Sequence, residues 1–294
     1  MEFRNIETFV RAAELLSFSR TAEELGYSQA AITVQIRQLE EELDTKLFDR
    51  VGRHVALTAK GEGFLPYAEE ILRASDDALA FGKKKGAPSG VLRVDVGSSI
   101  SSKIMPSVVE GFYHQYPDVK LCVKTSDYAK SGLERLRHNE VDFLYLIEKK
   151  SWIADVVSIA ECREDLVFVA SKGSPFVGQE NIPLEDLAYK KLISSNREIS
   201  FCYYLEQLFI ERNIEMKPAM EISAPDVIVK ILLEGIGVSF LPLFMVEDEI
   251  ADGSLVCLDV DVPHIEIFSQ LMMLKSKWIN PQMKAFINFM KDRR

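Results

Sequence analysis

The chain has 294 residues, of which 47% are hydrophobic and 27% charged, and its formal net charge at pH 7 is −10. This composition is ordinary for a globular protein, and the length suits two or three domains. No apolar run approaches membrane-spanning length, and the charged, helical pattern at the start excludes a signal peptide, so we expect a cytoplasmic protein without a membrane partner. The acidic balance also predicts weak non-specific affinity for nucleic acid.

Short amphipathic helices open the chain. The first is predicted at residues 6–16, and Ser19 is a favourable N-cap for a second helix that stops at Gly26, where a left-handed residue is needed. Ser28 then caps a third helix that begins at Gln29. The first helix has one apolar stripe, made of Ile6, Phe9, Val10, Ala13 and Leu16. The second and third helices and their tight turn predict a helix-turn-helix, a fold typical of DNA binding.

The third helix has two different faces. Its apolar residues fall at i, i+4, i+7 and i+11 and should pack inward: Ile32, Ile36, Leu39 and Leu43. The opposite face carries Gln29, Ala30, Thr33, Val34 and Arg37. Gln can bond to adenine, Arg to guanine or phosphate, and small apolar groups can touch a thymine methyl group. The acidic run at residues 40–42 should lie beyond the groove, because phosphate would repel it.

A small basic hairpin follows the third helix. Residues 51–53 can turn between two strands, and Val55 and Leu57 alternate on the return strand. Arg50 and Arg53 place positive charge at its tip, which could reach the DNA backbone or minor groove. This order predicts a winged helix-turn-helix. The alternative is a three-helix subdomain that uses the turn only for packing.

A long helix is predicted over residues 58–82, with Pro66 near its start. Its apolar seam suits a partner helix and comprises Phe64, Leu65, Ala68, Ile71, Leu72, Ser75 and Leu79. The alternative is that this seam packs on its own domain. Residues 82–90 combine Gly, Pro and Ser and read as a hinge.

The last two-thirds of the chain alternate strands and helices. Strands at 91–96, 119–124 and 142–147 alternate with a loop and helix at 98–117 and a helix at 129–139, which gives a βαβαβ order and a parallel sheet. A second α/β unit begins near Cys162, with strands at 166–170, 192–194 and 238–241 and helices at 203–212 and 225–234. The chain returns to the first unit with a strand at 267–274 and ends in a helix at 281–291.

Ligands in such folds bind beyond the carboxyl ends of the strands. Serine hydroxyls at helix starts and their backbone N–H groups can hold an anion. The alternatives are that the serines only cap helices and that the aromatic side chains belong to the core. The residues expected to contact a ligand are Ser98, Ser99, Ser101, Tyr128, Ser195, Phe201 and Gly237. We therefore expect a small carboxylate or other anion, with an apolar portion.

Catalytic and metal-binding motifs are missing from the sequence. The cysteines Cys122, Cys162, Cys202 and Cys257 form no close pair, and the four histidines have no metal-binding spacing. There is no nucleophile elbow, phosphate-binding loop or complete dinucleotide fingerprint. We expect no metal and no cofactor, and an enzyme is the least favoured function.

The segment from about Phe9 to Gly63 resembles the LysR-type transcriptional regulators. The match is carried by Ala12, Ala13, Ser17, Phe18, Ser19, Ala22, Leu25, Ser28, Gln29, Ile36, Leu39, Glu40, Leu43, Leu47, Phe48, Arg50, Leu57, Thr58 and Gly61. The family's DNA-contacting positions fall on Ser28, Gln29, Ala30, Thr33, Val34, Gln35 and Arg37, with Arg50 and Arg53 on the wing. The family often has a basic or polar residue at the position of Val34 and Pro at that of Ala30, so the ionic share of binding should be reduced.

The resemblance implies a fold and partners. The fold is an N-terminal winged helix-turn-helix at 1–60, a dimerising linker helix and hinge at 61–89, and a two-lobed, periplasmic-binding-protein-like α/β effector domain at 90–294. Lobe I would hold residues 90–160 and 267–294, and lobe II residues 161–266. The implied partners are double-stranded DNA, a small-molecule effector, a second copy of the chain in a homodimer or homotetramer, and RNA polymerase.

The resulting expectation is a transcription factor controlled by an effector between the two lobes. One alternative is a cytosolic small-molecule binding protein whose N-terminal module only dimerises. Another is a thiol-based redox sensor, because Cys202 lies near the segment where peroxide-sensing family members carry a reactive cysteine. A helix N-terminus could lower the pKa of Cys202, but no second cysteine follows within a dozen residues.

Overall fold

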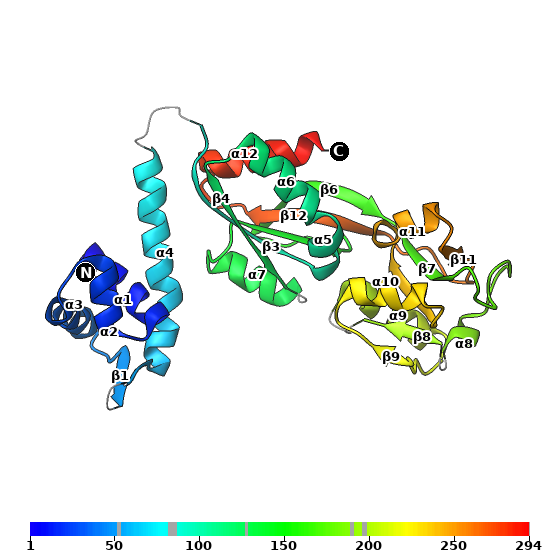
Figure 1. Cartoon of the computed structure of the whole chain (residues 1–294), viewed down its shortest axis with the longest axis horizontal. Helices are drawn as coiled ribbons and strands as arrows, with labels where there is room; N and C mark the ends of the chain where they lie inside the picture. The colour runs from blue at the N-terminus through cyan, green and yellow to red at the C-terminus, as the bar shows by residue number, and fades with distance from the viewer. Residues whose placement is uncertain (52–53, 82–86, 127–128, 189–190, 196–198, 294) are drawn as a thin grey trace. The chain divides into compact units, whose positions relative to one another are not determined.

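The computed structural model describes residues 1–51, 54–81, 87–126, 129–188, 191–195 and 199–293 (Figure 1). Two compact units divide the chain: Met1–Gly86 with His138–Glu140, and Ala87–Arg137 with Val141–Arg294. Among the described helices, none is both long and apolar enough to cross a membrane.

The first unit is a helix-turn-helix followed by a hairpin and a long helix. Its elements are α1 (Phe3–Leu15), α2 (Phe18–Leu25), α3 (Gln29–Glu42), β1 (Phe48–Val51), β2 (His54–Leu57) and α4 (Ala59–Phe81). β1 and β2 are antiparallel, with Val51 opposite His54. Gly26 has φ +71° and ends α2, and the side chain of Ser28 accepts the N–H of Ala31 at the start of α3, as predicted.

An aromatic cluster holds this unit together. The Phe9 ring lies 5.5 Å from that of Phe48 and 5.3 Å from that of Phe64, and Phe18 packs edge-on against Phe48. Ile32, Ile36 and Leu39 are buried in the same core, which confirms the predicted inward face of α3. The core therefore joins α1, α2, α3, the base of the hairpin and α4.

The cap of α2 differs from the prediction. Leu16 adopts a left-handed conformation with φ 47° and ends α1, so the next extended residue is Ser17. The Ser17 hydroxyl accepts the N–H of Arg20 at 3.4 Å, whereas Ser19 is exposed within the first turn. The N-cap of α2 is therefore Ser17 and not Ser19. The left-handed Leu16 ends α1 early enough for α2 to begin at Phe18.

The apolar seam of α4 packs largely on its own unit. Ala68 is buried, and Phe64, Leu65, Ile71 and Leu72 pack against the core that contains Phe9. The alternative, packing on its own domain, therefore accounts for part of this seam, and its pairing with a partner helix stays a prediction. Near the other end of the helix, Leu79 is exposed.

The second unit contains two five-stranded sheets. The first has the order β4-β3-β5-β12-β6. Its strands are β3 (Gly90–Val96), β4 (Val119–Thr125), β5 (Phe143–Glu148), β6 (Val156–Glu164) and β12 (Ile267–Leu274). β3 is parallel to β4 and β5, as predicted, whereas β12 is antiparallel to β5 and β6.

Helices cover both faces of this first sheet. They are α5 (Ser98–Lys103), α6 (Met105–Gln115), α7 (Ala129–Arg137) and α12 (Pro281–Asp292). Phe112 of α6 and Phe286 of α12 pack in one apolar cluster, and Leu136 of α7 packs in another with Leu144 and Leu146 of β5. α6 and α12 therefore lie on one face and α7 on the other (Figure 1).

The second sheet has the order β11-β7-β10-β8-β9. Its strands are β7 (Leu166–Ser171), β8 (Leu192–Ser194), β9 (Met220–Glu221), β10 (Val238–Pro242) and β11 (Leu255–Leu258). Its helices are α8 (Leu184–Leu187), α9 (Ser200–Glu211), α10 (Pro225–Leu233), the 3₁₀ turn η1 (Leu243–Met245) and α11 (Glu247–Ala251). The predicted return to the first sheet at β12 is confirmed.

The strand β6 was not predicted. It pairs with β12 and carries the first sheet to Glu164, so the change of sheet falls at Asp165 rather than at the expected 160/161 boundary. β6 is an edge strand with several charged residues, among them Glu161, Arg163 and Glu164. Such a composition lacks the continuous apolar run that marks a central strand.

Replacing the observed cap should weaken α2 locally. We expect Ser17→Ala to make the opening of α2 easier by about 1 kcal/mol, because a lost N-cap serine costs that much. Hydrogen exchange of the α2 amides in the full chain should then become about fivefold faster. Ser19→Ala is the matched control and should leave these rates unchanged. Equal acceleration by both substitutions would contradict the assigned cap.

Candidate functional site

The outer face of α3 exposes most of the residues predicted to contact DNA. Gln29, Ala30, Val34 and Arg37 are exposed, and Thr33 is half-buried between them. Val34 is 46% exposed in the middle of this face. An amide, a guanidinium and small apolar groups thus share one helical surface, which suits base edges in a major groove.

Gln35 does not share this face. Its side chain is 8% exposed, and its Oε1 accepts the hydroxyl of Thr8 on α1 at 2.7 Å. The bond ties α3 to α1 in the interior of the unit. Gln35 is therefore not one of the exposed residues that could contact DNA. Its side chain faces α1 because it lies one helical turn from the buried Ile32 and Leu39.

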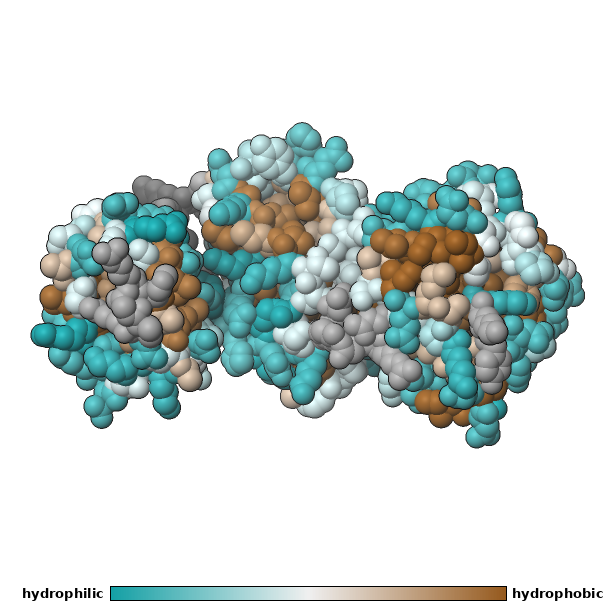
Figure 2. All heavy atoms as spheres, turned by 60° about the horizontal axis from the view of Figure 1, so that its bottom comes forward, coloured by the Kyte–Doolittle hydropathy of each residue, from teal (hydrophilic) through white to brown (hydrophobic). Residues whose placement is uncertain are grey.

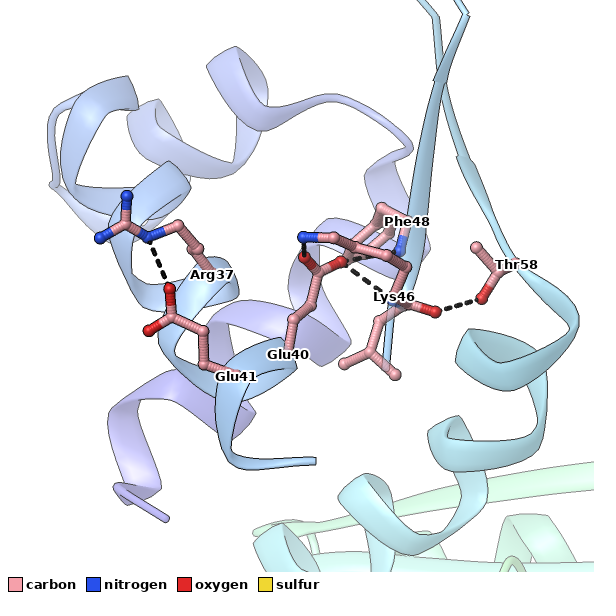
Figure 3. Close-up of polar contacts among 7 residues, drawn as sticks. Arg37, Glu40, Glu41, Lys46, Phe48 and Thr58 are labelled. Carbon is pink, nitrogen blue, oxygen red and sulfur yellow. Dashed lines mark hydrogen bonds and ion pairs between the residues drawn. The ribbon is translucent and has the colours of Figure 1, made fainter. Parts of the chain in front are cut away.

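The acidic run that ends α3 has internal partners. Glu41 pairs with Arg37 at 3.1 Å, and Glu42 pairs with the N-terminal amine of Met1 at 2.9 Å. Glu40 turns inward toward the start of β1 (Figure 3). Pairing reduces the repulsion that these carboxylates would exert on phosphate. It also leaves Arg37 partly neutralised.

The wing is described only in part. Arg50 lies opposite Val55 in the β1–β2 ladder, which places its backbone on the hairpin. The side chain of Arg50 and the whole of Arg53 lie outside the described residues. The predicted hairpin is confirmed as two strands of equal length.

The second unit has a cavity lined by residues in or beside α5, α7 and β5 of the first sheet and by residues at the start of α9. Its lining comprises Gly97, Ser98, Ser99, Ser126, Ala129, Leu144, Leu146, Ile147, Ile199, Ser200 and Phe201. Ser98, Ser99 and Phe201 thus come together as predicted. The lining combines the hydroxyl groups of four serines with aliphatic side chains. Such a mixture fits a small ligand with a polar head.

Other predicted residues lie apart from this lining. Ser101 hydrogen-bonds to Thr125 at 2.9 Å, and Ser195 is buried with no hydrogen-bond partner for its hydroxyl among the described residues. Tyr128 lies outside the described residues. Phe201 is 1% exposed and belongs to an apolar core cluster, so it forms a wall of the cavity and part of the core at once.

Gly237 serves the backbone rather than the cavity. It has φ +74°, and a Cβ there would lie 2.6 Å from the carbonyl oxygen of Lys191. Lys191 precedes β8, whereas Ser195 follows it, so Gly237 lies at the opposite end of the parallel pair β8–β10. The expectation that Gly237 lines the ligand site was wrong, because a left-handed turn explains it.

Sequence reasoning missed a polar network behind the cavity. Asp95 of β3 is fully buried and accepts Nε and Nη2 of Arg135 on α7 at 2.7 and 2.5 Å. Arg135 also donates to the hydroxyl of Ser126, a lining residue. Gly132 allows α7 to approach this closely, since a Cβ there would lie 2.6 Å from Leu144. The sequence signal that could have revealed this network is Asp95 itself, an acidic residue within a mostly apolar strand.

A hydrogen bond joins α9, a helix of the second sheet, to strand β5 of the first sheet beside the cavity. The Ser200 hydroxyl, at the start of α9, donates to the carbonyl of Ile147 on β5 at 2.5 Å. Farther along α9, Tyr204 donates to the carboxylate of Glu148. Burial and this carboxylate raise the pKa of Tyr204, so its hydroxyl stays a donor. Ser200 was another lining residue that sequence reasoning did not select.

Family comparisons match both units of the chain. Residues 3–62 match the model described as "Bacterial regulatory helix-turn-helix protein, lysR family", and residues 85–294 match "LysR substrate binding domain". The chain belongs to the LysR family. It is a LysR-type DNA-binding transcriptional regulator with an effector-binding domain.

Full-length relatives of this LysR-type regulator share its organisation. YwqM of Bacillus subtilis, an uncharacterized HTH-type transcriptional regulator, is 28% identical over 98% of both chains. The transcriptional activator CmpR of Synechocystis is 27% identical and covers 97% of this chain and 93% of its own.

Solved structures of low identity show the fold. A full-length OxyR variant from Pseudomonas aeruginosa has a TM-score of 0.74 at 21% identity, covering 99% of this chain and 95% of its own. Full-length CbnR complexed with its target DNA has a TM-score of 0.69 at 20% identity, covering all of both chains.

Cys202 of the regulator is not activated as the redox hypothesis requires. Its side chain is buried, and burial raises its pKa to about 11, despite its place in the first turn of α9. The redox alternative needed a lowered pKa, and burial raises it instead, because desolvation of the thiolate outweighs the effect of the helix N-terminus. Among the described residues, no group of three His, Cys, Asp or Glu side chains could hold a metal ion.

Thiol labelling should follow this burial. At pH 7 only about one Cys202 side chain in ten thousand is a thiolate, given a pKa of about 11. We expect iodoacetamide to modify the exposed Cys162 well before Cys202 in the full chain, as measured by peptide mass spectrometry. Labelling of Cys202 should accelerate about tenfold with each pH unit above 7 and level off near pH 11. Equal rates for both cysteines at pH 7 would contradict the burial argument.

Proposed function

We propose that this LysR-type regulator reads DNA with the exposed face of α3 and the wing, under the control of a small carboxylate bound in the cavity. The observation that carries the first part is the exposed set on α3. The proposed contacts are Ser28, Gln29, Ala30, Thr33, Val34 and Arg37 on the helix, with Arg50 and Arg53 on the wing. Gln35 supports the helix from behind through Thr8.

The chemistry of the cavity supports a carboxylate. Because Arg135 donates to the oxygen of Ser126, the hydroxyl hydrogen of Ser126 is left for a ligand acceptor. The first backbone amides of α9 add donors, since its N-cap, Ile199, has no side chain that accepts them. A ligand with an oxyanion would satisfy both sets.

An apolar extension of the ligand also has a place. A second depression shares Ala129 and Leu146 with the cavity and continues along Leu133, Ile153 and Met272. Tyr204 and Glu148 also line it. A carboxylate with an aliphatic or aromatic portion would place its head among the serines and its body here.

Assembly and location complete the proposal. We propose a homodimer or homotetramer built through α4 and the effector domain, acting on DNA in the cytoplasm with RNA polymerase as a further partner. Exposed apolar side chains support self-association: Leu79 on α4, Val109 and Tyr113 on α6, and Val227 and Leu233 on α10. Apolar patches also stand out from the hydrophilic surface in Figure 2. Paired recognition helices would meet half-sites about one DNA turn, or a multiple of it, apart.

The division of labour along the chain is part of this proposal. Residues 1–60 form the DNA-binding module, residues 61–89 the linker helix and hinge, and residues 90–294 the effector domain. Lobe I comprises residues 90–160 and 267–294 and lobe II residues 161–266, except that β6 supports moving the first boundary to 164.

DNA binding can be tested without knowing the target promoter. A duplex selected by the wild-type chain from a random pool serves as the probe. We expect Gln29→Ala to weaken binding to it by about 1–3 kcal/mol, because a base contact is lost, while the salt dependence stays the same. Gln115→Ala, at an exposed glutamine that ends α6 outside the DNA-binding module, is the matched control and should bind normally. An unchanged affinity for Gln29→Ala would remove this residue from the interface.

The effector class is tested by calorimetry. A panel of carboxylates, amines and neutral compounds of similar size should give heat only with carboxylates. Ser126→Ala should weaken the best of them about tenfold or more, since a hydrogen bond to a charged group is lost. Ser102→Ala, on α5 but outside the lining, should leave binding unchanged. Binding of amines alone would refute the proposed effector class.

A further inference from the structure

Glu40 makes more bonds than a solvated acid at a helix end. It is 8% exposed, and its Oε1 accepts the backbone N–H groups of Leu47 at 2.9 Å and Phe48 at 3.2 Å. Its Oε2 pairs with Nζ of Lys46 at 2.6 Å. Figure 3 shows the carboxylate of α3 facing this segment. One side chain of the recognition helix thus holds three consecutive residues that lead into the wing.

The segment held by Glu40 is the root of the wing. Phe48 opens β1 and lies opposite Leu57, the last residue of β2. On the other side of the hairpin, Thr58 donates its hydroxyl to the Lys46 carbonyl at 2.7 Å and its N–H to the Leu47 carbonyl at 3.0 Å. Both ends of the hairpin therefore meet at residues 46–48, and Glu40 is the group that connects this meeting point to α3.

Packing alone would not orient the wing. The Phe48 ring rests on Phe9 and Phe18, which resists separation but is not directional. Two bonds from backbone N–H groups to one carboxylate are directional and charge-assisted. Burying a carboxylate is costly unless donors and a cation surround it, and here both are present. This arrangement fixes the direction in which β1 leaves α3.

We propose that Glu40 is a positioning residue for DNA recognition, whose carboxylate fixes the wing relative to the exposed face of α3. Glu40 itself lies inside the unit and touches no DNA. Arg37 lies one turn before it on the outer face, so the same helix presents its side chains to bases and aims the hairpin. The inference rests on the proposed function, since it requires that the wing contacts phosphate.

The charge of Glu40 makes its replacement informative. If Glu40 were merely a negative charge near DNA, its removal would reduce repulsion and raise the affinity. A positioning role predicts the opposite sign, because a misdirected wing loses its phosphate contacts. Each lost contact should also lower the slope of log affinity against log salt by about 0.9. Simple destabilisation would lower the active fraction of protein but would not change this slope.

The experiment measures binding of full-length variants to the duplex selected by the wild-type chain, over a series of salt concentrations. The variants are Glu40→Ala, Glu40→Gln, the control Glu41→Gln, and Arg50→Ala as the reference for loss of a wing contact. We expect Glu40→Ala to bind at least tenfold more weakly with a slope reduced like that of Arg50→Ala. Glu40→Gln keeps one acceptor oxygen and should show a smaller loss. Glu41→Gln, which releases Arg37 from its ion pair, should bind at least as tightly as the wild type and keep its wing contacts.

Each outcome decides the proposal. Hydroxyl-radical footprints should lose the protection given by the wing while the protection given by α3 persists. If Glu40→Ala does not fold, Glu40→Gln alone is decisive. An unchanged slope with equal or higher affinity for Glu40→Gln, while Arg50→Ala lowers the slope, overturns the inference but leaves the proposed interface intact. An unchanged slope for Arg50→Ala overturns the wing contact itself and the inference with it.

Discussion

The high cost of burying a carboxylate shapes both units of this regulator. A buried carboxylate needs donors and a counter-charge, and these must come from other elements. Glu40 obtains them from the root of the wing, and Asp95 from Arg135 on α7. Asp142 accepts the N–H of Arg93 at 2.8 Å and pairs with Lys277 at 3.0 Å. In each case the acid ties together segments that apolar packing would hold only loosely.

These ties lie next to the two surfaces proposed to carry function. The bonds of Glu40 lie behind the DNA-reading face of α3, and the Asp95–Arg135 pair lies behind Ser126 in the cavity. In the proposed function, recognition in both places depends on side chains that are held in position by buried groups which do not themselves contact DNA or the ligand. The rigid support and the variable contact surface are separate sets of residues.

The periodicity of apolar residues in the sequence predicted the elements and helix faces that are defined by burial. The inward face of α3, the cap at Ser28, and the strands β3, β4, β5 and β12 follow directly from apolar spacing and capping chemistry.

The choice of partner was harder to predict, because the seam of α4 is apolar whether it packs on α1 or on another chain. Gln35 and Glu40 read as surface residues by type, yet both lie within a turn of the buried Ile36. Helical position was the better guide, because a polar side chain on a core-facing row must find a partner there.

The exposed Val34 has a consequence for how this regulator finds its targets. A cation at that place would attract every stretch of duplex alike, whereas an isopropyl group gains only where a complementary base edge meets it. Because Arg37 is paired to Glu41, the α3 face offers little unpaired positive charge for sequence-independent binding to DNA. On the proposed interface, the rest of the chromosome would compete weakly for the protein, so that few copies would be needed to occupy a few operators.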